Sequence, residues 1–178
     1  ECDAIIHVLR CFDNGNIVHV DGSVDPVRDK EIIDTELQLK DLETVETRIK
    51  RVEKLANVGG DKQAKIEYGL LLRYKEALEQ GKSARVVELE NEEEVTASKN
   101  MFLLTTKPVL YVCNVDDTSA KEGNQYVDAV REAIQGEDAE LIIISAQTEA
   151  DIADLETYEE KQMFLEDMGL EESGCNRL

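Results

Sequence analysis

Three short apolar segments constrain the fold of this chain more than any other feature. They are rich in β-branched residues and span Asp3–Leu9, Pro108–Cys113 and Glu140–Ile144. Short, nearly continuous apolar runs are typical of strands that are covered on both faces of a parallel sheet. We therefore expect an α/β fold built on a mostly parallel sheet.

The segment between the second and third runs supports a parallel arrangement. Apolar residues recur at helical spacing from about Gly123 to Gln135, and Gly136 follows as a helix stop. Strand, helix and strand in this order form a βαβ unit, which joins two parallel strands through a crossover helix. The second and third strands are thus predicted to lie in one parallel sheet.

A long charged segment between the first and second runs has the pattern of a helical hairpin. One helix is expected from Pro26 to about Asn57, a turn at Asn57–Asp61, and a second helix to about Gln80. Both apolar stripes are narrow, so we predict an antiparallel coiled-coil arm with much of its surface in solvent. The stripes consist of Leu42, Val45, Ile49, Val52 and Ala56, and of Ile66, Leu70, Leu71, Tyr74, Ala77 and Leu78.

Two further helices are expected, at about Glu93–Phe102 and Asp154–Gly169. The acidic run Glu88–Val95 is interpreted as a solvated face or a helix N-terminus, because it lacks the Asp, Asn and Gly pattern of a calcium loop. A bound metal is therefore not expected there.

Charge and composition exclude several classes of function. The chain has 20 Lys and Arg against 40 Asp and Glu, a net charge of −20, which argues against this segment alone gripping a phosphate backbone. No stretch approaches the roughly 18 uninterrupted apolar residues of a membrane span, and no signal peptide is visible. The four cysteines include no C-x-x-C pair, so neither a zinc site nor a disulfide framework is indicated, and a reducing cytoplasm is expected.

No residue set supports catalysis by this chain alone. His7 lies within an apolar strand and is interpreted as a core histidine, and His19 follows in a loop with no evident partner. Neither the G-x-x-x-x-G-K-[ST] phosphate loop nor the G-x-G-x-x-G fingerprint occurs. Any nucleotide chemistry would therefore need residues beyond those visible here.

Polar residues follow the second and third expected strands, where open α/β sheets place their ligands. Asn114–Asp117 follows the second strand and Ser145–Gln147 the third. In P-loop domains of the GTPase class these positions carry the N-K-x-D and S-A-K boxes that hold the base. The alternative is that Asn114 and Asp117 only cap a loop, and that Ser145 only caps a helix.

At this level of detail the chain resembles the YchF and Obg-like ATPase family, a branch of the Obg-type translation-factor GTPases, over nearly its whole length. The segments that carry the resemblance are Cys2–Phe12, Asn16–Val20, Val24–Pro26, Glu36–Leu37, Asp41–Thr44, Lys107–Val115, Ser145–Gln147, Phe164–Leu165, Gly169–Leu170 and Gly174–Leu178.

The resemblance implies the C-terminal half of a P-loop G domain, with a mostly parallel sheet and an inserted antiparallel helical hairpin. Residues 1–30 would be the first part of the G domain and residues 31–100 the coiled-coil arm. Residues 101–178 would be its second part, with the base-binding loops, leading towards a TGS domain.

The resemblance also implies a function. Family members bind and hydrolyse ATP in preference to GTP and associate with the ribosome. Asn114, Val115 and Asp117 would contact or pack beside the base, and Ser145, Ala146 and Gln147 would close the pocket. Asp117 departs from the family, which usually has Glu there, and Asp is the side chain with which ordinary GTPases bind guanine. Because the box also lacks the GTPase lysine, ATP is the expected nucleotide and GTP the alternative.

In this family the phosphate loop, switch regions and magnesium ligands precede the position of Glu1, and the TGS domain follows that of Leu178. Phosphoryl transfer needs the backbone cradle, the lysine and Mg²⁺ together, so this chain alone is expected to be inactive. The strand at Ala4–Leu9 would become an open apolar edge. We expect aggregation or a non-native, swapped dimer through this edge, or else that the chain is a piece of a longer protein.

Two other functions stay open. The arm could be a binding module that docks on the ribosome, RNA or a protein without nucleotide chemistry, through cations such as Arg48, Lys50 and Arg51. The plainer interpretation of these cations is a solvated coiled-coil face with pairs inside each helix. The chain could also be an α/β interaction domain that binds no nucleotide.

Overall fold

The computed structural model of this chain describes residues 2–13, 23–58 and 61–177. The chain divides into two compact units. The hairpin unit comprises Glu1–Ile5 and Glu31–Pro108, and the sheet unit comprises Ile6–Lys30 and Val109–Leu178. The segment Asn16–Val20, with His19, lies outside the described residues. The functional division of the sequence into a G domain and an arm stays a prediction.

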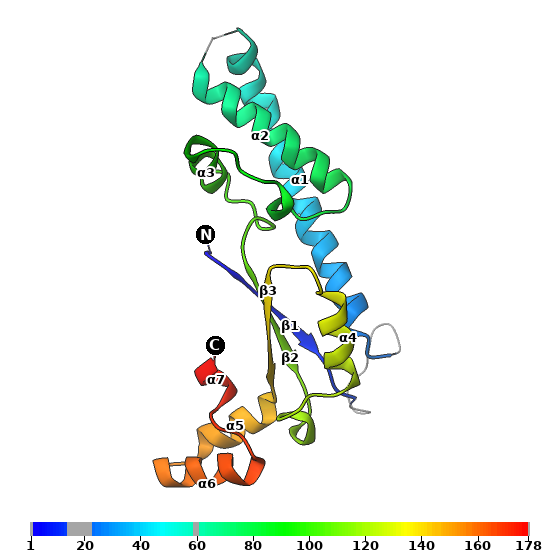
Figure 1. Ribbon diagram of the computed structural model, residues 1–178, viewed down its shortest axis with the longest axis vertical. Helices are drawn as coiled ribbons and strands as arrows, with labels where there is room; N and C mark the ends of the chain where they lie inside the picture. Colours follow the sequence, from blue (N-terminus) through cyan, green and yellow to red (C-terminus); the bar gives the residue numbers. More distant parts are fainter. Residues whose placement is uncertain (1, 14–22, 59–60, 178) are drawn as a thin grey trace. The chain divides into compact units, whose positions relative to one another are not determined.

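The sheet has the predicted parallel arrangement. Its strands are β1 (Ile5–Arg10), β2 (Val109–Asn114) and β3 (Ala139–Ile144), which are labelled in Figure 1. Their order in the sheet is β1, β2, β3. β2 and β3 pair in parallel from Val109 opposite Ala139 to Asn114 opposite Ile144. At the two ends of β1, Ile5 N donates to Pro108 O and Cys11 N donates to Asn114 O, so the register of β1 against β2 also advances in parallel.

β1 differs from the expectation in one respect. Ile6 and Val8 are 58% and 63% exposed, so the expectation that every strand is covered on both faces is wrong for β1. Side chains alternate along a strand, and only the face with His7 and Leu9 is buried. β1 lies at the edge of the sheet, and the face with Ile6 and Val8 is more than half exposed. His7 is buried, and its ring centroid lies 5.5 Å from that of Tyr111. Its interpretation as a core residue is confirmed.

Cys11 and Cys113 lie side by side where β1 and β2 end. Cys11 N donates to Asn114 O at 2.7 Å, and neither cysteine has measurable exposure. The hydrogen bond to the Cys113 thiol, together with burial, raises the pKa of Cys11. The interpretation of Cys113 as a small buried apolar residue is confirmed.

The crossover helix α4 (Gln125–Ala133) confirms the predicted βαβ unit. It begins where the Asn124 side chain accepts hydrogen bonds from the N–H groups of Tyr126 and Val127. Gly136 follows it with a φ of +89°, a conformation that residues with a Cβ rarely adopt, and the chain then turns into β3.

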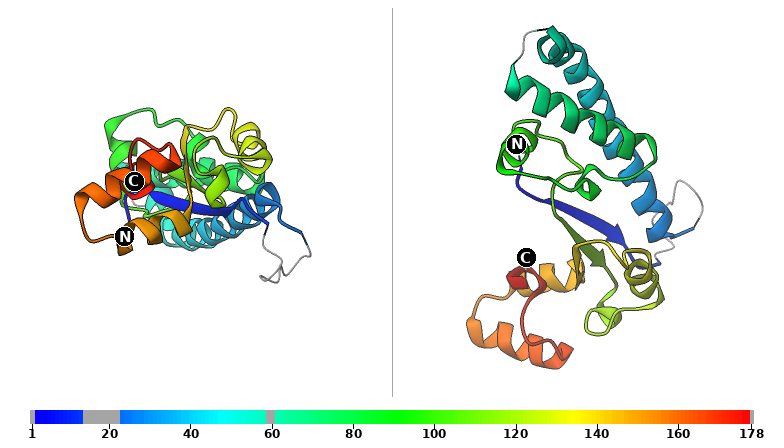
Figure 2. Two further views of the ribbon diagram at one scale, coloured as in Figure 1. Left: turned by 90° about the horizontal axis from the view of Figure 1, so that it is seen from below. Right: turned by 45° about the horizontal axis from the view of Figure 1, so that its top comes forward.

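The C-terminal region contains more than the one expected helix. Its helices are α5 (Ala146–Asp154), α6 (Tyr158–Met168) and α7 (Gly174–Arg177), which lie next to one another in both views of Figure 2. The expectation of a helix that starts at Asp154 is therefore wrong, because Asp154 is the last residue of α5. α6 starts afresh because Thr157 and Glu160 form a reciprocal capping box.

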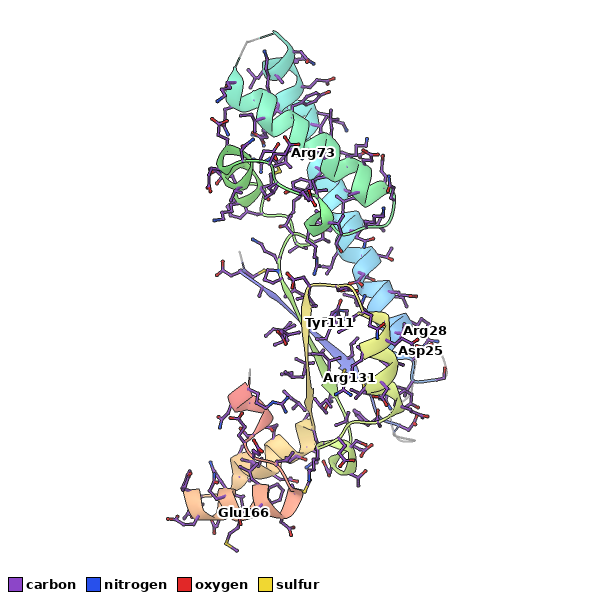
Figure 3. The ribbon with its side chains drawn as sticks, viewed as in Figure 1. Asp25, Arg28, Arg73, Tyr111, Arg131 and Glu166 are labelled. Carbon is purple, nitrogen blue, oxygen red and sulfur yellow. The ribbon has the colours of Figure 1, made fainter. Side chains whose placement is uncertain are left out.

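The two helices of the predicted hairpin are confirmed. α1 (Pro26–Val58) and α2 (Lys62–Glu79) run side by side (Figures 1 and 2). Asp25 Oδ1 accepts a hydrogen bond from Arg28 N at the start of α1 (Figure 3). Asp61 caps α2 by accepting from Gln63 N and Ala64 N.

The hairpin is more fully covered than the sequence suggests. The short helix η1 (Ala84–Val86), α3 (Glu92–Lys99) and the residues after α3 pack against it. α3 ends at Lys99, before the expected Phe102, which is 55% exposed and has a φ of +55°. The shared core consists of Val45, Leu70, Leu71, Tyr74, Leu78, Ala84, Ala97, Met101 and Leu103.

A buried carboxylate joins the hairpin to the segment that follows α3. Asp41, which is 2% exposed, accepts hydrogen bonds from Leu104 N at 2.8 Å, Thr105 N at 2.7 Å and Thr105 Oγ1 at 2.7 Å. Thr105 Oγ1 in turn accepts from Ala84 N at 2.9 Å. α1, η1 and the segment after α3 are thereby held by one polar network inside an apolar core.

Glu92, Glu93 and Glu94 of the acidic run form the first turn of α3, which confirms the interpretation as a helix N-terminus for this part of the run. Glu94 is buried and pairs with Arg73 of α2, labelled in Figure 3. Ion pairs inside one helix occur as expected, at Lys40 with Glu43 and at Lys75 with Glu79. Other ion pairs, such as Lys75 with Glu46, join different helices, which the sequence interpretation did not include. No group of three potential metal ligands occurs among the residues that the structure describes.

Candidate functional site

The candidate site lies where β2 and β3 end in the sheet unit. Because the strands are parallel and in register, the residues that follow them meet at one edge of the sheet. Asn114 Oδ1 accepts a hydrogen bond from Ala146 N at 3.0 Å, and Val115 N donates to Ile144 O at 2.9 Å. The two loops singled out in the sequence are thus joined by a side chain and by the backbone.

Asp117 brings the same two loops together a second time. It is exposed and begins the short helix η2 (Asp117–Ser119). Its Oδ1 accepts hydrogen bonds from Ser145 Oγ at 2.7 Å and from Thr148 Oγ1 at 3.2 Å. Within the described part of the chain, its Oδ2 has no hydrogen-bond donor. One carboxylate oxygen is therefore held in place while the other is available.

Ser145 has two roles in the local structure. It is the N-cap of α5, where its Oγ accepts from Thr148 N at 3.2 Å, and the same hydroxyl donates to Asp117. The capping role considered from the sequence is therefore present, and it coexists with the contact to Asp117. Ser145 and Thr148 are 2% and 1% exposed, so bulk water does not compete for these hydrogen bonds.

The other predicted site residues take different positions. Val115 is 3% exposed and packs in the core beneath the loop. Ala146 and Gln147 are exposed in the first turn of α5, where Gln147 Nε2 donates to Asp151 Oδ1 at 2.9 Å. The loop between β2 and η2 thus has a buried base and a polar, exposed rim.

Asp116 is occupied within its own loop. Its Oδ1 accepts from Thr118 Oγ1 at 2.6 Å and from Ser119 N at 3.0 Å, which makes it the cap of η2. These hydrogen bonds hold the pKa of Asp116 below its ordinary value, and the one from Thr118 has the largest effect. Partial desolvation acts in the opposite direction but is outweighed. Asp116 therefore stabilises the loop, and Asp117 is its available carboxylate.

Two residues at this edge were missed by the sequence interpretation. Thr148 carries no sequence signal for this contact, because its partner Asp117 lies 31 residues earlier, in the loop after the neighbouring strand. Glu149 carries none either: its carboxylate accepts from Gly174 N at 2.6 Å and from Cys175 N at 3.1 Å, across 25 and 26 residues. Gly174 is required there because a Cβ would lie 2.7 Å from Ile144 Cγ1.

Comparison with known proteins gives close relatives. No protein-family profile matches the chain. "Ribosome-binding ATPase YchF" of Bacillus subtilis is 50% identical over 180 residues, which covers 100% of this chain and 48% of the relative. "Obg-like ATPase 1" of Caenorhabditis elegans is 37% identical over 172 residues, which covers 95% of this chain and 43% of the relative. The chain spans about half the length of the curated relatives it matches.

A solved structure agrees with these relatives. The YchF GTPase of Schizosaccharomyces pombe superposes with a TM-score of 0.81 at 30% identity, covering 94% of this chain and 46% of that one. The parallel sheet, its paired strand-end loops and the inserted hairpin define the class as an α/β fold of the G-domain type. Within that class, the chain belongs to the YchF and Obg-like ATPase family.

None of the described helices combines the length and the apolar composition that crossing a membrane demands.

Proposed function

We propose that this chain supplies the base-recognition half of the nucleotide-binding domain in a ribosome-associated cytoplasmic ATPase. The printed names of its relatives, "Ribosome-binding ATPase YchF" and "Obg-like ATPase 1", support this proposal. The solved relative is described as a GTPase, so GTP is the alternative nucleotide. The observation that carries the proposal is the double connection of the two strand-end loops, from Asn114 to Ala146 and from Asp117 to Ser145.

The chemistry of these residues fits the edge of a purine base. Asn114 uses its amide oxygen to join the loops, so its NH₂ group is left as a donor for a ring nitrogen. Asp117 Oδ2 is an acceptor for an amino group of the base. Val115 packs beneath, and Ser145, Ala146 and Gln147 close over the base. Because the donors and acceptors are already fixed, little conformational entropy is lost on binding.

Phosphate binding and hydrolysis require further groups. Phosphoryl transfer depends on a backbone cradle, a lysine and Mg²⁺, and this sequence contains no phosphate-loop motif. We propose that these groups come from the rest of the whole protein and that this chain alone does not hydrolyse nucleotide. Its own residues hold and orient the base.

The test is nucleotide binding by the whole protein that carries this chain. Replacing Asn114 with Ala removes both the loop connection and the proposed donor, so we expect the Kd of a fluorescent ATP analogue to rise about tenfold or more. The matched control is Asn91→Ala, which removes a helix-capping asparagine from the hairpin unit and should leave the Kd unchanged. Equal Kd values for Asn114→Ala and the unaltered protein would contradict the proposed role.

A second candidate function is docking of the hairpin on the ribosome. Lys50, Arg51 and Lys54 are exposed on α1, and no ion pair among the described residues holds them. Arg48 does not belong with them, because it pairs with Glu67 and donates to Asn100 O at 2.7 Å. These three cations could therefore contact RNA phosphates without a loss of internal structure.

Co-sedimentation with ribosomes tests the docking function. The double variant Lys50→Glu with Arg51→Glu should weaken binding, with a smaller effect at high salt, because screened phosphate contacts contribute less. Arg131→Glu, an exposed charge reversal in the sheet unit, is the control. If the double variant and the control sediment alike, the hairpin does not dock through this surface.

A further inference from the structure

The Asp117 carboxylate is held more completely than contact with a base requires. Its Oδ1 accepts two hydroxyl donors, Ser145 Oγ at 2.7 Å and Thr148 Oγ1 at 3.2 Å. A carboxylate oxygen offers about two lone-pair sites, so these two donors saturate it. Ser145 alone would leave one site open, and Thr148 fills it. Because Thr148 is 1% exposed, its hydroxyl has little freedom to turn elsewhere.

The saturation of Oδ1 changes which base edge Asp117 can match. Guanine presents two adjacent N–H donors, N1–H and the 2-amino group, which pair best with both oxygens of a carboxylate. Adenine presents one donor, the 6-amino group, beside an acceptor, N1. With Oδ1 satisfied inside the protein, only Oδ2 can accept from the base. The two lone-pair sites of Oδ2 diverge, whereas the two guanine donors point in parallel, so Oδ2 can align with only one of them. One available oxygen therefore suits adenine and leaves one guanine donor poorly paired.

We propose that Thr148 is a positioning residue that makes Asp117 a single-acceptor reader of the base, and thereby favours adenine over guanine nucleotides. The inference rests on the proposed function, because it requires that the base lies against Asp117. It explains how an Asp at this position can serve an ATPase. Thr148 acts through Asp117 and does not itself contact the base.

The 2-amino group of guanine provides a direct measurement. Inosine triphosphate keeps N1–H and lacks the 2-amino group, so the ratio of GTP to ITP affinity reports whether a second acceptor is available. In the unaltered whole protein we expect GTP and ITP to bind with similar affinity and ATP to bind more tightly than either. Titration calorimetry with the three nucleotides gives these ratios without the need for turnover.

The variants test the hydroxyl of Thr148 specifically. Thr148→Val keeps the shape and removes the donor, so Oδ1 regains a free site, and GTP should then bind about tenfold more tightly than ITP. Thr148→Ser keeps the hydroxyl and should restore the similar affinities of the unaltered protein. A purely structural role for Thr148 would change the affinities for GTP and ITP together and would leave their ratio unchanged.

The outcomes separate the inference from the proposed function. If the ratio of GTP to ITP affinity is the same in the unaltered protein, Thr148→Val and Thr148→Ser while ATP still binds, the inference is overturned and the proposed function remains. If the unaltered protein binds none of the three nucleotides, both are overturned. Melting temperatures establish that each variant is folded, and Thr148→Ala supplies the same comparison should the valine variant not fold.

Discussion

The two units of this chain use carboxylates for different purposes. In the hairpin unit, Asp41 accepts three hydrogen bonds inside an apolar core and joins segments that are far apart in sequence. In the sheet unit, Asp117 accepts two hydroxyl donors near the surface and keeps one oxygen available. The first carboxylate is satisfied by the fold alone, whereas the second is only partly satisfied by it.

This difference teaches where stability and the proposed function reside. A fully satisfied buried carboxylate specifies one packing arrangement, and removing it leaves several groups unpaired. A half-satisfied carboxylate at a strand end contributes less to stability and is prepared for a ligand. The hairpin unit should therefore respond to mutation mainly through stability, and the strand-end loops mainly through binding.

The largest effect is expected at Asp41. Asp41→Ala leaves Leu104 N, Thr105 N and Thr105 Oγ1 without their acceptor, so we expect unfolding to become easier by about 3–5 kcal/mol. Urea denaturation followed by circular dichroism measures the change. Glu43→Ala on the exposed side of the same helix is the control and should leave the midpoint unchanged. A loss under about 1 kcal/mol at Asp41 would remove the basis of the comparison.

The next effect concerns the edge of the sheet. Val8 is 63% exposed on the edge strand β1, so the isolated 178-residue chain should self-associate through this strand. Val8→Lys should shift the chain towards the monomer in sedimentation analysis, because a charged side chain disfavours pairing at an edge. Leu55→Lys, at a residue 55% exposed in the hairpin unit, is the matched control. A monomeric unaltered chain would show that the edge is protected.

A smaller effect is expected at Ser145. Ser145→Ala removes the cap of α5 and should lower stability by about 1 kcal/mol, while it also weakens nucleotide binding through Asp117. Thr157→Ala removes a cap of the same kind from α6 and should cost a similar amount with no effect on binding. If Ser145→Ala binds nucleotide as tightly as Thr157→Ala and the unaltered protein, Ser145 acts only as a cap.

The smallest effect is a dependence on pH in the hairpin unit. Burial raises the pKa of Glu94, but hydrogen bonds from Glu90 N and Arg73 outweigh burial and hold it below the ordinary value of 4.5. Below pH 4.5 the unfolded state therefore binds the proton first, and stability falls as the pH drops through the folded pKa. Urea midpoints between pH 7 and pH 3 should fall less for Glu94→Gln than for the unaltered chain. If the urea midpoints of Glu94→Gln and of the unaltered chain fall equally with pH, Glu94 does not contribute to the pH dependence of stability.

The fold could be predicted where the signal is local. Apolar periodicity located the strands and the hairpin, because each stripe is repeated within a few turns of its own segment. The packing of α3 and Leu103 on the hairpin could not be predicted, because it depends on a match between surfaces far apart in sequence. The break between α5 and α6 had a sequence signal, the Thr157 to Glu160 capping box, and it was overlooked within a continuous helical pattern.

The candidate site shows the same limit. Asn114 and Ser145 follow recognisable strands, so parallel pairing alone places them at one edge. The contact from Thr148 to Asp117 joins residues 31 positions apart, and that from Glu149 to Gly174 depends on where the C-terminal segment returns. Neither the spacing nor the composition of the sequence predicts contacts between residues so far apart in the chain.

The reaction rates of the two neighbouring thiols at the ends of β1 and β2 report how often the sheet opens locally. Cys2 and Cys175 are exposed and should react with a thiol reagent within the first phase, whereas Cys11 and Cys113 have no measurable exposure. The two buried thiols can react only after a local opening that exposes them, so the slow phase reports how readily this part of the sheet opens. A nucleotide that tightens the Asn114 loop should lengthen the slow phase and leave the fast phase unchanged. The two buried cysteines thus report the opening of the sheet, and the two exposed cysteines serve as the internal reference, without an added label.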